Sequence, residues 1–246
     1  MDYVFVAGEG DLGLLKGQED SKLGIFEDQS AEFLSVAVNL CNQFALVPEF
    51  SGTVTLYKTP RHKNPTELKN GVNVHDYSDA RQLVTFLAQR GQRFVLGICG
   101  HGGQAVNLSA SEGLLGYVEL CQGLTSNARQ ISSTDINSFA TLVVYFGLHC
   151  HAGSLTNRLS SEIFCFPVIG EEKAQNTHMD AFTKQSSSQS VPSKLDFALC
   201  SAECEDVDWR DASGAIFDAL SDLNNATLTQ PVKKPTGIKT RPGRWQ

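Results

Sequence analysis

Short apolar runs alternate with amphipathic helical stretches along most of this chain, and that alternation constrains the fold more than any other feature. Residues 94–99 and 142–146 are almost continuously apolar, which is typical of strands buried on both faces of a parallel sheet. Between them and earlier strands lie helical patterns such as "SDARQLVTFLAQRG", with a Ser or Asp cap, apolar spacing and a Gly stop. The chain therefore predicts an α/β fold of βαβ units with a mostly parallel central sheet flanked by helices.

The remaining segments extend the same pattern. Further strands are predicted at 3–7, 52–59, 161–169 and 195–200, and further helices at 29–46 with a cap near Asp28 or Ser30, at 113–121, at 132–140 and at 208–225. Polar, turn-rich residues at 62–76 and Ser/Gln-rich residues at 171–194 predict loops. We expect a single domain over residues 1–225, followed by a flexible tail at 226–246.

Composition narrows the class of protein. The chain has 246 residues and a net charge of −7, with Lys and Arg scattered, which argues against a nucleic-acid groove. No apolar run approaches the roughly 20 residues of a membrane span, and the start shows no secretory signal, so a cytoplasmic protein is expected. Seven irregularly spaced cysteines indicate free thiols rather than a disulfide framework.

Two of the apolar runs end in reactive side chains. The apolar run that opens "FVLGICGHGG" leads to His101, and the run that opens "LVVYFGLHCHAGS" leads to Cys150. Because the carboxyl ends of parallel strands meet at one edge of a sheet, neighbouring strands would bring this imidazole and this thiol together. A cysteine needs a nearby base to supply thiolate, and histidine is suited to that role. The pattern predicts a Cys–His dyad, with the backbone amides of Gly102 and Cys150 as oxyanion donors worth about 3 kcal/mol each.

The same residues resemble the caspase–legumain–metacaspase superfamily of cysteine peptidases over about residues 77–170. The resemblance implies a caspase-like three-layer sandwich and an endopeptidase with Cys150 as nucleophile, His101 as catalytic histidine and Gly102 as oxyanion donor, acting on a protein or peptide substrate without a cofactor. It also implies that the strand after the nucleophile builds the pocket for the residue before the scissile bond. The candidate substrate-binding residues are Phe166, Val168, Glu171 and Glu172. Because "FCFPVIGEEKAQ" holds two acids and no arginine, we expect Lys or Arg there.

Three alternatives stay open at this stage. Cys99, His101, His149, Cys150 and His151 would cluster if the two strands adjoin, and zinc binds such mixtures of ligands. Their spacing matches no strong metal motif, so we predict no metal. A second alternative is an inactive caspase-like scaffold that acts through protein interaction. The third is structural: Cys99, Cys121 and Cys165 as core thiols, His149 and His151 as structural or solvent-facing neighbours, and Glu171 and Glu172 as solvated loop acids.

Overall fold

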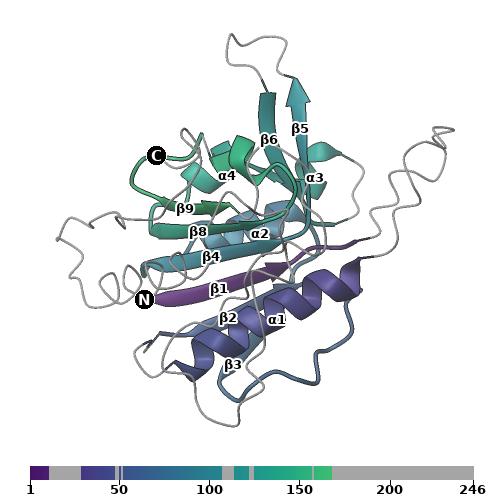
Figure 1. Ribbon diagram of the computed structural model, residues 1–246, viewed down its shortest axis with the longest axis vertical. Coiled ribbons are helices and arrows are strands. Elements are labelled where there is room, and N and C mark those ends of the chain that lie inside the picture. Colours follow the sequence, from purple (N-terminus) through teal and green to yellow (C-terminus); the bar gives the residue numbers. More distant parts are fainter. Residues whose placement is uncertain are drawn as a thin grey trace, which may run out of the picture.

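The computed structural model describes residues 1–10, 29–47, 50, 52–106, 114–121, 125–156 and 158–167, with the backbone alone for 104–106, 114–115, 164 and 166–167. Its central element is a six-stranded sheet in which every neighbouring pair is parallel (Figure 1). The strand order is β3 (Val72–Asp76), β2 (Val54–Lys58), β1 (Asp2–Ala7), β4 (Phe94–Cys99), β8 (Leu142–Leu148) and β9 (Phe164–Pro167). The predicted α/β fold with a parallel central sheet is confirmed. The expected strand at 195–200, helix at 208–225 and tail at 226–246 lie outside the described residues.

The order of the strands creates a switch in direction between β1 and β4. From β1 the chain adds β2 and β3 on one side, then returns to place β4, β8 and β9 on the other. In open parallel sheets, the crevice outside the carboxyl ends of the strands at such a switch is the usual position of a functional site.

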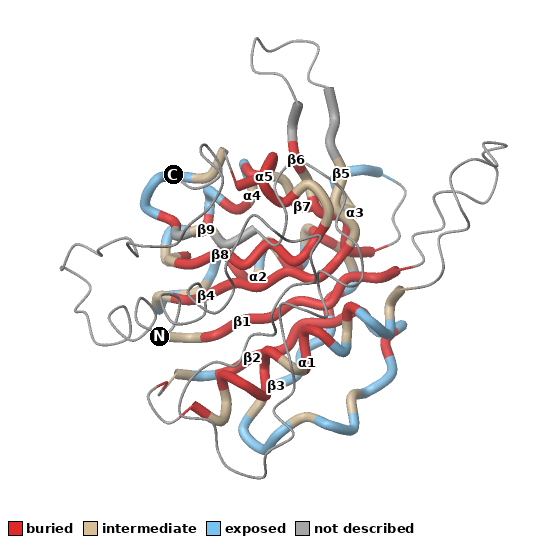
Figure 2. Tube along the Cα trace, in the orientation of Figure 1, coloured by how far each residue is buried: buried red, intermediate tan, exposed pale blue. Residues whose placement is uncertain are grey.

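Side chains alternate between the two faces of this sheet, and each face packs against its own helices. On one face the helix α1 (Ser30–Leu46) covers a cluster that includes Phe5, Cys99 and Leu148. On the other face α2 (Ala80–Ala88) and α4 (Ser133–Asn137) cover a second cluster that includes Leu96 and Tyr145. The central strands are buried along most of their length (Figure 2).

A second, three-stranded antiparallel sheet runs steeply across the direction of the central strands (Figure 1). It consists of β5 (His101–Val106), β6 (Leu114–Glu119) and β7 (Gln130–Ser132), with the short helix α3 (Ser126–Arg129) before β7. The predicted helix at 113–121 is therefore wrong. Strand pairing determines the conformation of this segment. The backbone of β6 hydrogen-bonds to β5 on one side and to β7 on the other, and the Val118 side chain packs into the cluster beneath α2 and α4.

The predicted loop at 62–76 is also partly wrong, because it contains β3. This strand lies at the edge of the sheet, and four of its five side chains are exposed. A strand with so little buried surface carries no apolar run, so its sequence has the polar composition of a loop.

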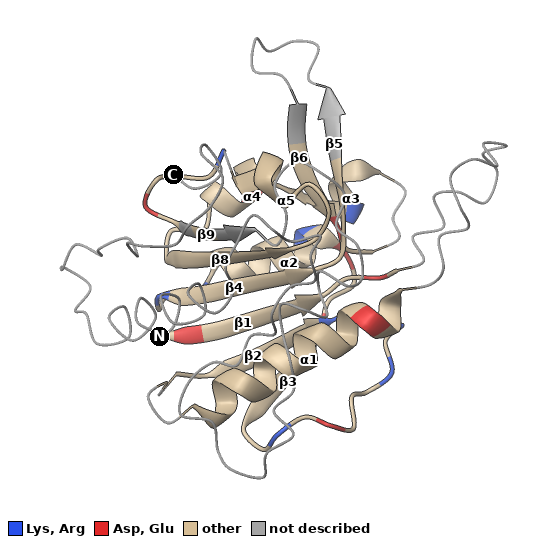
Figure 3. Ribbon diagram, viewed as in Figure 1, with Lys and Arg blue, Asp and Glu red and all other residues tan. Residues whose placement is uncertain are grey.

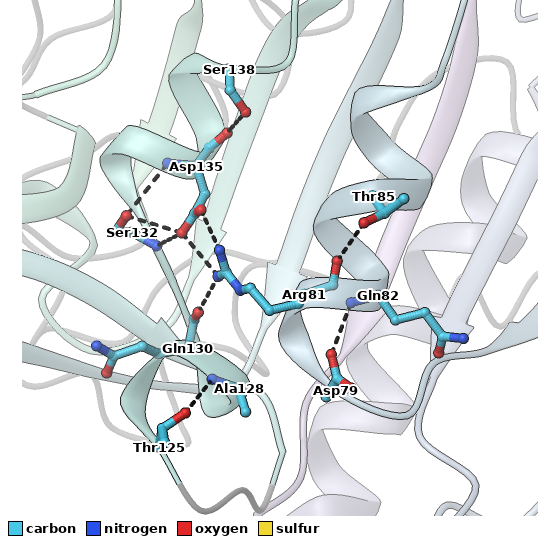
Figure 4. Close-up of polar contacts among 10 residues, drawn as sticks. All are labelled: Asp79, Arg81, Gln82, Thr85, Thr125, Ala128, Gln130, Ser132, Asp135 and Ser138. Atoms are coloured by element: carbon cyan, nitrogen blue, oxygen red, sulfur yellow. Dashed lines mark hydrogen bonds and ion pairs between the residues drawn. The ribbon is translucent and has the colours of Figure 1, made fainter.

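An arginine joins α2 to the small sheet (Figure 4). The Arg81 guanidinium donates hydrogen bonds of 2.6 and 3.1 Å to the two carboxylate oxygens of Asp135, and one of 2.8 Å to the Gln130 carbonyl. Asp135 in turn closes a capping box with Ser132 at the start of α4, which confirms the predicted capped helix there. Burial alone would raise the pKa of Asp135, but Arg81 and Ser132 lower it below its ordinary value. Arg81 thus joins α2 to α4 by a charged, bidentate contact and to β7 of the small sheet by one further hydrogen bond.

Basic and acidic side chains are interspersed over the part of the chain that the structure describes (Figure 3). Within that same part, no helix has the length and apolar character needed to cross a bilayer.

Candidate active site

The two reactive residues follow neighbouring strands at the same level. β4 and β8 pair in parallel, and Cys99 lies opposite Leu148 in their register. His101 and Cys150 each come two residues after this pair, and paired strands are about 4.8 Å apart. The expectation that the two apolar runs adjoin is confirmed.

The His101 ring lies on the α1 side of the central sheet. Cys99 and Leu148, the last residues of β4 and β8, both belong to the cluster beneath α1. The ring of His101 does lie there, in an edge-to-face contact of 5.1 Å with Phe33 of α1. Cys150 follows Leu148 by two residues and lies in the turn between β8 and α5.

A backbone carbonyl settles which nitrogen of His101 carries the proton. Nε2 lies 2.8 Å from the carbonyl oxygen of Gly10, in the loop after β1. A carbonyl can only accept, so Nε2 donates, and in the neutral ring Nδ1 is the nitrogen that can accept a proton. The fold thus prepares His101 as a base through Nδ1.

The Gly10 carbonyl is itself positioned by the start of α1. Gly10 N–H donates a 2.7 Å hydrogen bond to Ser30 Oγ, and a Cβ at position 10 would lie 2.2 Å from the Gln29 nitrogen. The Ser30 hydroxyl therefore binds the loop after β1. The helix α1 begins after Gln29, and no side chain caps it, so the expected cap at Asp28 or Ser30 is wrong. Only glycine fits this contact between the β1 loop and the helix.

Burial determines the charge of His101. Removal from water lowers the pKa of this imidazole below its ordinary value of 6.5, and the hydrogen bond to Gly10 offsets part of that effect. The ring is consequently neutral at pH 7, which is the form that can act as a base.

Cys150 differs from most of the other described thiols. Cys41, Cys99 and Cys121 are buried, and burial raises the pKa of each, to about 11 for Cys121. Cys150 is half-buried, as is Cys165 on β9. All five are free thiols, as expected, whereas Cys200 and Cys204 lie outside the described residues. Since reactive cysteines need access to solvent, Cys150 has a suitable position among them.

The chain turns sharply after the thiol. His151 has a φ of +55°, in the left-handed region that non-glycine residues seldom occupy, and α5 (Ala152–Thr156) begins at the next residue. Cys150 is consequently the last residue before a tight turn at the carboxyl end of β8.

Gly102 packs directly on the backbone of Cys150. A Cβ at position 102 would come within 1.7 Å of the Cys150 carbonyl oxygen and 2.7 Å of His149 Nδ1. The two residues predicted as oxyanion donors are therefore in contact through their backbones, and position 102 accepts only glycine.

Other predicted site residues fall at or beyond the limit of the described chain. Phe166 lies on β9, paired with Phe146 of β8, and its backbone alone is described. Val168, Glu171 and Glu172 lie outside the described residues, so the substrate pocket stays a prediction.

Sequence reasoning missed an acid beside the histidine. Glu119 of β6 lies directly opposite His101 of β5, and opposed residues of an antiparallel pair share a face. Its side chain is buried, with Oε1 4.0 Å from Arg129 Nη2, and burial raises the pKa of this carboxyl. The missed strand assignment for β6 hid this pairing.

The metal alternative gains no support from the geometry. Among the described residues, no three His, Cys, Asp or Glu side chains lie close enough to hold a metal ion. His149, one of the proposed ligands, points to the opposite face from His101 and bonds to Tyr145 there.

Comparison with protein-family models and with curated proteins yields no match. A solved structure, that of protein GSU0716 from Geobacter sulfurreducens, is similar over 35% of this chain, with 19% identity and a TM-score of 0.25. The similar region spans 37% of that protein's length.

Proposed function

We propose that this protein is a cysteine endopeptidase in which Cys150 and His101 form the catalytic dyad. The observation that carries the proposal is their matched position, two residues beyond the Cys99–Leu148 pair on neighbouring parallel strands. A thiol and a neutral imidazole at the same level of one sheet edge are the parts that nucleophilic acyl transfer requires.

The chemistry follows from the tautomer of His101. Nδ1 accepts the proton of the Cys150 thiol, and the thiolate attacks the carbonyl carbon of the substrate peptide bond. The carbon–sulfur bond forms, the carbonyl oxygen becomes an oxyanion, and the imidazolium gives its proton to the leaving amine as the carbon–nitrogen bond breaks. Water, deprotonated by the same nitrogen, then hydrolyses the thioester and restores the thiol.

The backbone amides of Gly102 and Cys150 are the proposed donors to the oxyanion. The close packing of Gly102 on the Cys150 backbone supports this role, because it brings the two residues into contact and leaves the backbone little freedom to move. Donors held before the reaction cost no reorganisation when charge develops.

The finer description of the fold belongs to the same proposal. A parallel sheet covered by α1 on one face and by α2 and α4 on the other supports a caspase-like three-layer sandwich. The acids Glu171 and Glu172, in a segment without arginine, support a substrate with Lys or Arg before the scissile bond.

Two properties of peptide hydrolysis test the proposal: its dependence on the residue before the cleaved bond, and its dependence on pH. With a panel of fluorogenic peptides carrying Lys, Arg, Asp or Asn before the cleaved bond, we expect hydrolysis to be fastest after Lys or Arg. Because burial lowers the pKa of His101, its base form persists on acidification, and kcat/KM should fall only below pH 6.5.

Two results would count against this account. An acidic limb with its midpoint above pH 6.5 would mean that His101 is not the base. Absence of hydrolysis across the whole panel would favour the non-catalytic scaffold instead.

A further inference from the structure

We infer that His149, held by Tyr145, is a positioning residue that fixes the peptide group of Cys150 from beneath the site. The catalytic consequence rests on the proposed function, whereas the contact itself does not. Tyr145 belongs to the cluster beneath α2 and α4, on the opposite side of β8 from α1, and the His149 ring bonds to it there.

Two hydrogen bonds determine the state of the His149 ring. Nδ1 lies 2.8 Å from the carbonyl oxygen of Cys150, and Nε2 lies 2.8 Å from the hydroxyl oxygen of Tyr145. The carbonyl accepts, so Nδ1 carries the proton; Nε2 of the neutral ring then accepts from the Tyr145 hydroxyl. The result is a directed chain from Tyr145 through His149 to the backbone of the nucleophile.

The His149 ring is fully enclosed by its neighbours. His149 and Tyr145 are both 0% exposed. A Cβ at Gly147 would lie 3.4 Å from His149 Nε2, so the β8 backbone also packs against the ring. Burial lowers the pKa of His149 to about 4, and therefore the neutral tautomer persists at pH 7.

The Cys150 peptide group needs such support because it leads into a strained turn. His151 follows at φ +55°, a conformation that is unfavourable for a non-glycine residue and persists only where the surroundings enforce it. The carbonyl of Cys150 is held on two sides, by the ring nitrogen of His149 and by the Cα of Gly102. Fixing this carbonyl fixes the backbone that carries the thiol.

Substitutions separate this role from simple packing. His149→Leu keeps the volume and removes both hydrogen bonds, while His149→Asn keeps an amide donor near the position of Nδ1. We expect kcat to fall about 100-fold in His149→Leu with KM changed little, because misplacement of a nucleophile by about 1 Å costs that much. His149→Asn should recover most of the loss, and Tyr145→Phe, which lacks only the hydroxyl, should lose less than tenfold.

A measurement that needs no hydrolysis keeps this inference distinct from the proposed function. The alkylation rate of Cys150 by iodoacetamide should fall in His149→Leu and recover in His149→Asn, while His75→Leu, at an exposed position on β3, leaves it unchanged. Nitrogen chemical shifts of His149 should show the Nδ1–H tautomer at pH 7. If the native protein hydrolyses no peptide but these results hold, the proposed function fails and the positioning role stands.

The inference is overturned by either of two outcomes in folded variants. One is a His149→Leu protein with native kcat and native alkylation rate. The other is a His149→Asn protein impaired as much as His149→Leu, which would mean that the ring acts by its shape alone. If both substitutions at position 149 unfold the protein, the Tyr145→Phe variant provides the test. A His149 ring protonated at Nε2 in that variant, together with an unchanged alkylation rate of Cys150, would contradict the positioning role of His149.

Discussion

Replacement of Cys150 by alanine is expected to lower kcat/KM for peptide hydrolysis by at least about 1,000-fold while the protein stays folded. Removal of the nucleophile leaves only binding and oxyanion stabilisation, which supply a small remainder of the rate. The folded state should change little, because Cys150 is half-buried at the end of β8 and contributes little packing. Steady-state kinetics together with thermal unfolding of the purified variant measure both effects.

Cys165 provides the matched control. It is the other half-buried thiol of the described chain, and it lies on β9, opposite Tyr145, away from the carboxyl end of β8. Cys165→Ala should keep native kcat/KM. Full activity in Cys150→Ala, or loss of activity in Cys165→Ala alone, would assign the nucleophile to another residue.

The second large effect is expected from Gly102→Ala. The new methyl group would stand 1.7 Å from the Cys150 carbonyl oxygen and 2.6 Å from its carbon, both backbone atoms that no rotamer change can move. Either β5 or the Cys150 turn must shift, and overpacking of this kind costs about 1–3 kcal/mol of stability. Since the shift would displace Gly102, the proposed oxyanion donor, together with Cys150, the proposed nucleophile, we expect kcat to fall about 100-fold.

Gly91→Ala is the control for this substitution. Gly91 follows α2, and a Cβ there meets no atom within 4 Å, so activity and unfolding temperature should stay native. Native kcat in Gly102→Ala, measured beside Gly91→Ala by the same assay, would show that contact with Cys150 plays no part in catalysis.

Hydrophobic patterning was sufficient to predict the strands that carry the site. β4 and β8 are buried on both faces, so their apolar runs stand out from the flanking turns, and their ends locate His101 and Cys150. Parallel strands bring their carboxyl ends together, so the two residues were expected at one edge if their strands are neighbours, and the pairing of β4 with β8 meets that condition. β3 and β6 were missed because one has exposed side chains and the other depends on pairing with β5 and β7 for its conformation.

The details that give the site its chemistry depend on contacts distant in the sequence. The carbonyl of Gly10 reaches His101 because β1 lies beside β4, and Phe33 reaches it from α1. Every residue has a backbone carbonyl, so the residue type at position 10 could not have indicated that this carbonyl bonds to His101. His149 was expected to be structural or solvent-facing, and only its burial against Tyr145 shows that its ring bonds to the backbone of the nucleophile.

Covalent labelling by an electrophilic peptide tests the dyad most directly. A peptidyl chloromethyl ketone with Lys or Arg next to the reactive group, followed by intact-mass and peptide mapping, reports which thiol reacts and how fast. The account predicts one adduct, on Cys150, that is absent in Cys150→Ala and forms at least about tenfold more slowly in His101→Ala, because the base that generates the thiolate is gone. Labelling of another cysteine, or a Cys150 adduct that forms equally fast without His101, would contradict it.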